Sequence, residues 1–289
     1  MYNYFQWWLS VEIKPLWYKI WKYIISAVMF ILLTIFVAVL REKFWDFIFY
    51  GIIPVFIIDL LIDFSVYAYT MWRQRKYDLV IFDLDGTLIN SIDDLKDSVN
   101  HILDMHNKPQ RSLEEIKSFV GNGIYRLIEL SFPKGTKEEE LKIAYQEMKD
   151  YYKEHCLIKT KPYKGVNLLL KRLKAMGVKT AIVSNKSDNS VQVIKETYFG
   201  ELIDFAIGEK EGLNRKPSKD MIEKTCECLK VSLDKVLYVG DSEVDVITAE
   251  NSNIDCVIVT YGFRDRDFLL NNGAKKLEND ILKIQKHLY

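Results

Sequence analysis

The chain has 289 residues and is formally neutral, with 40 Lys and Arg against 40 Asp and Glu. Its length predicts two or three structural units. The balanced charge, without a basic patch, argues against nucleic acid as a partner. The four cysteines form no CxxC pair, which favours free thiols in a reducing compartment over a disulfide framework.

The N-terminal region, residues 1–76, is strongly apolar and carries all six tryptophans. Residues 23–40 contain no charge and would extend about 27 Å as a helix, close to the thickness of the hydrocarbon core of a bilayer. Residues 47–72 form a second apolar stretch, and tryptophans near the ends of such stretches are typical of membrane interfaces. We predict an all-α transmembrane hairpin, with helices at about 20–40 and 47–72 and the lipid bilayer as partner. A buried hairpin of a soluble protein is the alternative.

Charge predicts the orientation of this hairpin. Lys14, Lys19 and Lys22 precede the first stretch and three more basic residues follow the second, whereas the turn at 41–43 is less positive. The positive-inside rule then predicts a cell-membrane protein with both chain ends and the remaining domains in the cytoplasm.

Two carboxylates are the unusual feature of the second stretch. Asp59 and Asp63 share one helix face, and each would cost about 2.5–3.5 kcal/mol near the middle of a membrane. Protonation, contact with the first helix or a homodimer through these helices would reduce this cost. Alternatively, Gly51 and Pro54 break the segment and leave part of it at the membrane interface.

Residues 79–88, LVIFDLDGTL, place two aspartates directly after an apolar run. Four consecutive apolar residues suit a strand that is covered on both faces. Asp83 and Asp85 then emerge at the carboxyl end of the strand, where open α/β sheets bind ligands, and Gly86 permits a tight turn there. Two adjacent carboxylates repel each other unless a cation or a shared proton intervenes, and Mg²⁺ is the expected cation. Aspartates that cap a helix or begin a turn are the alternative.

About 75 residues separate this run from the next predicted segment of the core. Residues 91–105 have apolar side chains at helical spacing, and 113–119 and 138–152 are also predicted helices. We therefore predict an α-helical cap over 91–162, inserted into a core formed by 77–90 and 163–289.

Three further polar motifs follow in the chain. Ser184 and Asn185 end the predicted strand 179–183, and their hydroxyl and amide can hold phosphate oxygens. Lys216 stands in RKPS, and an ammonium group there suits phosphate as a point charge. The predicted strand 236–239 runs into Asp241 and Asp245. A helix cap, a solvated charge and a turn former are the respective alternatives.

In this order, the four motifs resemble those of the haloacid dehalogenase (HAD) superfamily, over residues 77–289. The resemblance implies an α/β fold, a Rossmann-like parallel-sheet core with a cap inserted after the first motif, and phosphoryl transfer through an aspartyl-phosphate. It implies that Asp83 is the nucleophile and that Asp85 protonates the leaving group and then activates water. Ser184 and Lys216 would hold the phosphoryl group.

The resemblance also implies a Mg²⁺ cofactor. Its ligands would be the Asp83 carboxylate, the main-chain carbonyl of Asp85 and Asp241. Asp245 belongs to the same acidic set and would support the site from behind the ligands. An aspartate at position 85 favours hydrolysis, because the related P-type ion pumps carry threonine there and keep a long-lived phosphoenzyme.

The cap is similar to that of phosphoglycolate phosphatase-like members, including the sequence FVGNG at 119–123. The predicted substrate-binding residues are Gly86, Thr87, Asn185, Gly121, Asn122, Gly123 and Arg126. For the cap residues, an ordinary helix–helix turn with a surface arginine is an equal alternative.

The predicted function is that of a membrane-anchored, Mg²⁺-dependent phosphatase acting on a small phosphorylated metabolite. Within the enzymes, a phosphomutase or pyrophosphatase of the same superfamily is the alternative. Outside them, the alternative is a non-catalytic membrane scaffold that retains the fold. The cap sets the choice of substrate, and its sequence does not identify one.

Overall fold

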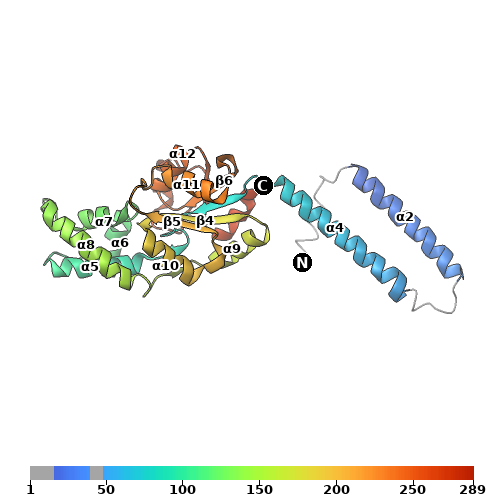
Figure 1. Cartoon of the computed structure of the whole chain (residues 1–289), viewed down its shortest axis with the longest axis horizontal. Coiled ribbons are helices and arrows are strands. Elements are labelled where there is room, and N and C mark those ends of the chain that lie inside the picture. Colours follow the sequence, from blue (N-terminus) through green and yellow to red (C-terminus); the bar gives the residue numbers. More distant parts are fainter. Residues whose placement is uncertain (1–15, 40–47) are drawn as a thin grey trace. The chain divides into compact units, whose positions relative to one another are not determined.

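The computed structural model describes residues 16–39 and 48–289, which are drawn in colour in Figure 1. Contacts divide the chain into two compact units, Met1–Met71 and Trp72–Tyr289. The first contains the N-terminal helices and the second contains the sheet and the cap.

The N-terminal unit contains two long helices, α2 (Leu16–Val39) and α4 (Ile53–Gln74). The last residues of α4 belong to the second unit. A short π-helix, η1 (Ile48–Ile52), leads directly into α4. Large apolar side chains on both helices are exposed, among them Phe30 at 69% and Phe56 at 73%.

The prediction of two membrane-spanning helices is not supported. Within residues 16–39 and 48–289, no helix is long and apolar enough to cross a membrane. Asp59 and Asp63 interrupt the apolar surface of α4, and the π-helix takes up the start of the second predicted segment. The predicted end of the first helix, at residue 40, and the turn at 41–43 lie outside the described residues.

The core is a six-stranded sheet in the order β5-β4-β1-β6-β7-β8, and every neighbouring pair is parallel. The strands are β1 (Leu79–Phe82), β4 (Lys179–Ser187), β5 (Phe205–Glu209), β6 (Val236–Gly240), β7 (Asp255–Val259) and β8 (Leu277–Glu278). The four residues of β1 are fully buried between β4 and β6, as their continuous apolar run predicts. The predicted α/β parallel-sheet core is therefore confirmed.

Helices cover both faces of this sheet, because successive side chains of each strand point to opposite sides. Val80 and Phe82 belong to one apolar cluster, with side chains of α9 (Val166–Ala175) and α10 (Asp188–Tyr198). Leu79 and Ile81 belong to another, which includes side chains of α11 (Asp220–Leu229) and α12 (Glu243–Asn251). Figure 1 shows α9 and α10 on one side of the sheet and α11 and α12 on the other.

The chain ends with α13 (Arg266–Asn271) and η4 (Ile281–Leu288), and the short turns η2 (Gly200–Leu202) and η3 (Leu233–Lys235) precede β5 and β6.

The segment after β1 forms a helical cap with an apolar core of its own. Its helices are α5 (Ile92–Met105), α6 (Leu113–Phe119), α7 (Gly123–Ser131) and α8 (Glu138–His155), grouped at one end of the sheet in Figure 1. The chain enters and leaves the cap through the antiparallel pair β2 (Ile89–Asn90) and β3 (Lys161–Pro162). At this entry, the Asp94 carboxylate accepts the backbone N–H groups of Lys159 and Thr160, at 2.8–3.0 Å.

Candidate active site

The carboxyl ends of three neighbouring strands and the cap enclose a cavity of about 60 Å³. Asp83 and Asp85 follow β1, Ser184 and Asn185 lie within β4, and Asp241 follows β6. All five line the cavity, and so does Lys216 of the third motif, so the structure brings the four motifs together. The other lining residues are Lys186, Ser242, Phe263 and Arg264 from the core, and Leu95, Val120, Gly121, Gly123, Ile124, Leu127 and Tyr152 from the cap.

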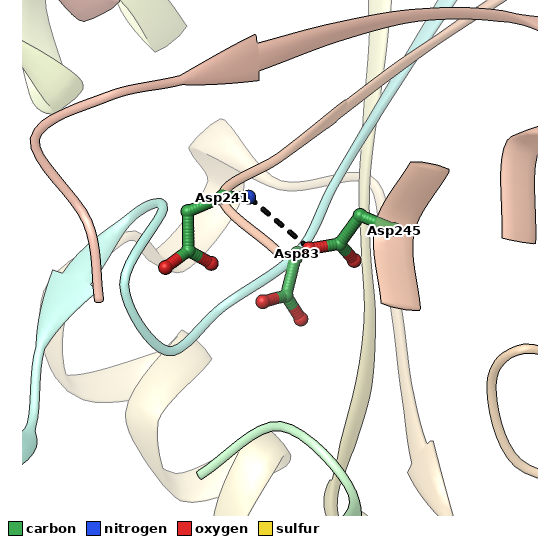
Figure 2. Close-up of side chains that lie close together, drawn as sticks. All are labelled: Asp83, Asp241 and Asp245. Carbon is green, nitrogen blue, oxygen red and sulfur yellow. Dashed lines mark hydrogen bonds between the residues drawn. The ribbon is translucent and has the colours of Figure 1, made fainter. Parts of the chain in front are cut away.

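Three buried carboxylates meet at this end of the sheet. Asp83, Asp241 and Asp245 each offer one oxygen such that these atoms lie within 4.8 Å of one another. In Figure 2 the carboxylates of Asp83 and Asp241 point in the same direction, and that of Asp245 turns toward the main chain of Asp241. Burial raises the pKa of Asp83 to about 7, and the negative charge of Asp245 adds to this rise. The positive charge of Lys216 acts in the opposite direction. Burial also raises the pKa of Asp241 well above its ordinary value.

This arrangement fits a hard cation. Lys216 supplies a single positive charge to a site with three carboxylates, and it pairs with only two of them, Asp83 and Asp245. Carboxylate oxygens are the ligands that Mg²⁺ prefers, and Asp83 and Asp241 present theirs toward the cavity.

Lys216 is the cation that the protein itself supplies. Its ammonium group donates to Asp83 Oδ1 at 2.7 Å, Asp245 Oδ1 at 2.8 Å and the Tyr238 hydroxyl at 3.1 Å. A lysine has three donors, and these three acceptors use them all. Burial opposes the charged form, but the two carboxylates outweigh it and raise the pKa of Lys216. It therefore stays charged beside Asp83.

Asp245 holds the fourth motif in place. Its Oδ1 accepts hydrogen bonds from Lys216 and Tyr238, and its Oδ2 accepts the Ser242 hydroxyl and the N–H groups of Asp241 and Ser242, all at 2.7–3.1 Å. Five accepted bonds occupy this carboxylate. Asp245 is thus placed as a support behind Asp83 and Asp241.

Two glycines allow the backbone to approach Asp241 closely. A Cβ added to Gly86 or Gly262 would lie 2.2 or 2.3 Å from Asp241 Oδ2, and Gly86 has a φ of +88°. Oδ2 accepts the Phe263 N–H at 2.8 Å, while Oδ1 accepts the Thr87 hydroxyl at 3.3 Å. Gly86 and Thr87, predicted to bind substrate, therefore contact Asp241 and orient it.

Asn185, also predicted to bind substrate, lines the cavity, and its side-chain amide is hydrogen-bonded to the backbone. Its Oδ1 accepts the Lys216 N–H at 2.8 Å, and its Nδ2 donates to the carbonyls of Lys216 and Gly121 at 3.0 Å. Asn185 thereby joins the loop of Lys216 to the cap. Ser184 keeps its place at the cavity, where its hydroxyl accepts the Lys186 N–H at 3.2 Å.

The cap contributes Gly121 and Gly123 to the cavity lining, and Gly123 begins α7. Asn122 and Arg126 lie outside that lining, and Arg126 forms an exposed ion pair with Glu129. The arginine at the cavity is Arg264, which donates to the carbonyls of Lys117 and Val120 in the cap and pairs with Glu243.

The sequence-based prediction missed Lys186, Tyr152 and Arg264. Lys186 follows Ser184 and Asn185 at the end of a strand, and that position was a usable signal. Tyr152 and Arg264 lie in a helix and a loop with no local pattern of their own.

Known proteins share this fold and these motifs. The haloacid dehalogenase-like hydrolase family matches residues 80–259. The phosphoglycolate phosphatase of Psychrobacter arcticus is 33% identical over 194 residues, covering 64% of this chain and 84% of that protein. Phosphoglycolate phosphatase 1 of Pseudomonas aeruginosa is 32% identical over 203 residues, covering 68% and 74%.

Solved structures agree with these sequence relatives. A predicted phosphoglycolate phosphatase from Haemophilus somnus has a TM-score of 0.68 and 27% identity, covering 75% of this chain and all of that one. A predicted phosphatase from Clostridium acetobutylicum has a TM-score of 0.65 and 29% identity, covering 73% and 97%. The chain therefore belongs to the haloacid dehalogenase-like hydrolase family, among its phosphatases.

Proposed function

We propose that this protein is a Mg²⁺-dependent phosphatase that hydrolyses a small phosphomonoester through a phosphoryl group carried on Asp83. The observation that carries the proposal is the setting of the Asp83 carboxylate. It lines the cavity, its Oδ1 lies 2.7 Å from the Lys216 ammonium, and Asp241 stands beside it.

The roles are those that the family resemblance implies, and the positions of the side chains support them. Asp83 attacks phosphorus, and Lys216 offsets the charge that develops on the phosphoryl oxygens. Asp85 gives a proton to the leaving oxygen and later takes one from the attacking water. The Ser184 hydroxyl binds a phosphoryl oxygen. Asp83, Asp241 and the Asp85 carbonyl would hold Mg²⁺, which when bound neutralises phosphate charge.

The relatives guide the choice of substrate. The two sequence relatives compared above are named phosphoglycolate phosphatases, which makes 2-phosphoglycolate the first candidate. The cavity, about 60 Å³, also suits a compact leaving group.

A panel of phosphorylated metabolites that includes 2-phosphoglycolate tests the proposal with the purified full-length chain. We expect Mg²⁺-dependent phosphate release that EDTA stops and added Mg²⁺ restores. No release from any member of the panel would contradict the proposed activity and favour a non-catalytic scaffold.

Metal binding has a readout that does not need turnover. At a concentration 100 times its Kd, Mg²⁺ should stabilise the folded protein by about 2.7 kcal/mol and raise its melting temperature by about 5–10 °C. Asp241→Asn should lose most of this shift. Asp267→Asn is the control, because Asp267 lies in α13 and is exposed. An equal shift in Asp241→Asn and wild type would place the cation elsewhere.

We further propose that the N-terminal unit associates with a lipid bilayer, with the catalytic unit in the cytoplasm. Support comes from the exposed Phe30 and Phe56, the tryptophans at 1–76 and the basic residues at both ends of this region. Contact between two copies through the same surface would form a homodimer. In flotation with anionic vesicles, the full chain should rise with lipid and residues 72–289 should stay below; both staying below would contradict the proposal.

A further inference from the structure

A buried lysine links the cap to Asp85. Lys186, in β4, is only 5% exposed. Its ammonium nitrogen lies 3.0 and 3.3 Å from the two carboxylate oxygens of Asp85. The same nitrogen donates to the hydroxyl of Tyr152 at 2.7 Å. Tyr152 belongs to α8 of the cap and is 1% exposed, so the lysine and the tyrosine are both buried where core and cap meet.

The contact restricts the position of Asp85. The Asp85 carboxylate stands on the loop after β1, where the Ser91 hydroxyl donates to its Oδ1. Lys186 approaches both of its oxygens from β4 and so limits rotation of the carboxylate. A lysine stem is flexible, and a second partner is needed to hold the ammonium group in one place. Tyr152 is that partner, and it lies in the cap.

The ion pair places a cation 3.0 Å from Asp85, the group that takes a proton from water in the second half of the reaction. Lys216 is committed to Asp83 and Asp245, so the two buried lysines serve different carboxylates.

We propose that Lys186 is a positioning residue. Held by Tyr152, it keeps the Asp85 carboxylate oriented to activate the water that attacks the phosphoryl group on Asp83. This inference rests on the proposed phosphatase function. In the step concerned, the water oxygen bonds to phosphorus as its proton passes to Asp85. The bond between phosphorus and the Asp83 oxygen breaks, and Asp83 leaves as a carboxylate. Because Tyr152 belongs to the cap, fast hydrolysis of the phosphoenzyme requires the cap to be closed.

The test separates the two halves of the reaction with p-nitrophenyl phosphate and Mg²⁺. Nitrophenolate leaves readily without a proton, so formation of the phosphoenzyme depends little on Asp85. We expect Lys186→Met to lower kcat about 100-fold and Tyr152→Phe about 10-fold, with kcat/KM changed less than about threefold. Both variants should release a burst of one nitrophenolate per site. Acid quenching should then recover an acyl phosphate that hydroxylamine cleaves.

Tyr151→Phe is the matched control. Tyr151 precedes Tyr152 in α8, and its ring stacks on His101 and His155. Removing its hydroxyl should leave kcat and the accumulation of phosphoenzyme at wild-type values. If Lys186→Met does not fold, Tyr152→Phe decides the matter, since it removes a single oxygen.

Three results would overturn the inference while leaving the phosphatase function intact. A rise in KM with unchanged kcat would make Lys186 a substrate ligand. Equal losses of kcat and kcat/KM without a burst would place its effect before hydrolysis. Wild-type kinetics in Tyr152→Phe would show that hydrolysis of the phosphoenzyme does not need this contact with the cap. By contrast, a wild-type chain that hydrolyses neither p-nitrophenyl phosphate nor any metabolite of the panel contradicts the proposed function itself, and the inference with it.

Discussion

Replacing Asp83 by asparagine should reduce turnover by a factor of about 10⁴ or more, the loss typical of removing a catalytic nucleophile. The amide has nearly the same shape but does not attack phosphorus. Phosphate release and hydroxylamine-sensitive labelling from a radioactive substrate measure the effect, and both should vanish together.

The Asp83→Asn variant should nevertheless fold. The substitution removes one of three crowded carboxylates, and burial already disfavours the charge at this position. Circular dichroism and a melting curve provide the control. Turnover that survives in a folded Asp83→Asn protein would rule out Asp83 as the nucleophile.

Lys216→Met should have the largest effect on stability. Lys216 is 3% exposed and donates to Asp83 and Asp245, so its removal leaves two buried carboxylates without their cation. Breaking a buried pair in this way costs about 3–5 kcal/mol, equivalent to a fall in melting temperature of about 6–20 °C. Turnover should be lost as well, because the phosphoryl group loses the same charge.

Lys219→Met is the matched control for this measurement. Lys219 pairs with Glu223 at 2.8 Å, but the side chains are 55% and 44% exposed. Exposed pairs contribute about 0–1 kcal/mol, so the melting temperature should change little. If Lys216→Met melts at the wild-type temperature, the buried pairs do not stabilise the fold as described.

The strands that carry the motifs could be predicted because their signal is local. Apolar runs at 79–82, 181–183 and 236–239 are characteristic of covered parallel strands, and the structure has β1, β4 and β6 there. Polar groups that follow such runs lie at the carboxyl edge of a parallel sheet, and the resemblance to the HAD superfamily placed Asp83 and Asp241 in one metal site there.

The cap was harder to predict because its contacts with the core are not local. The helical period located α5, α6 and α8, but α7 begins at Gly123, inside a segment interpreted as a loop. The resemblance selected Arg126 for an anion, whereas the structure turns it toward Glu129. Arg264, 144 positions along from Val120, is the arginine that lines the cavity, and it donates to the Val120 carbonyl of the cap.

The N-terminal region shows how far composition alone can predict structure. Hydropathy and tryptophan placement predicted two spans, yet no helix among residues 16–39 and 48–289 is long and apolar enough to cross a membrane. In the second segment, Asp59 and Asp63 are the obstacle to crossing a membrane. Apolar composition measures how strongly a segment avoids water and does not specify what covers it.

The sequence by itself determined the parallel α/β core and the order of its motifs, since both depend on short local patterns. The tertiary structure alone decided how the acidic groups divide their work. Asp245 accepts five hydrogen bonds, and the Asn185 side chain is hydrogen-bonded to the backbone. Asp85 pairs with Lys186, 101 positions away. The physical reason is that hydrogen bonds in a buried site depend on which elements pack together, and packing brings Tyr152 of the cap to a lysine of the core.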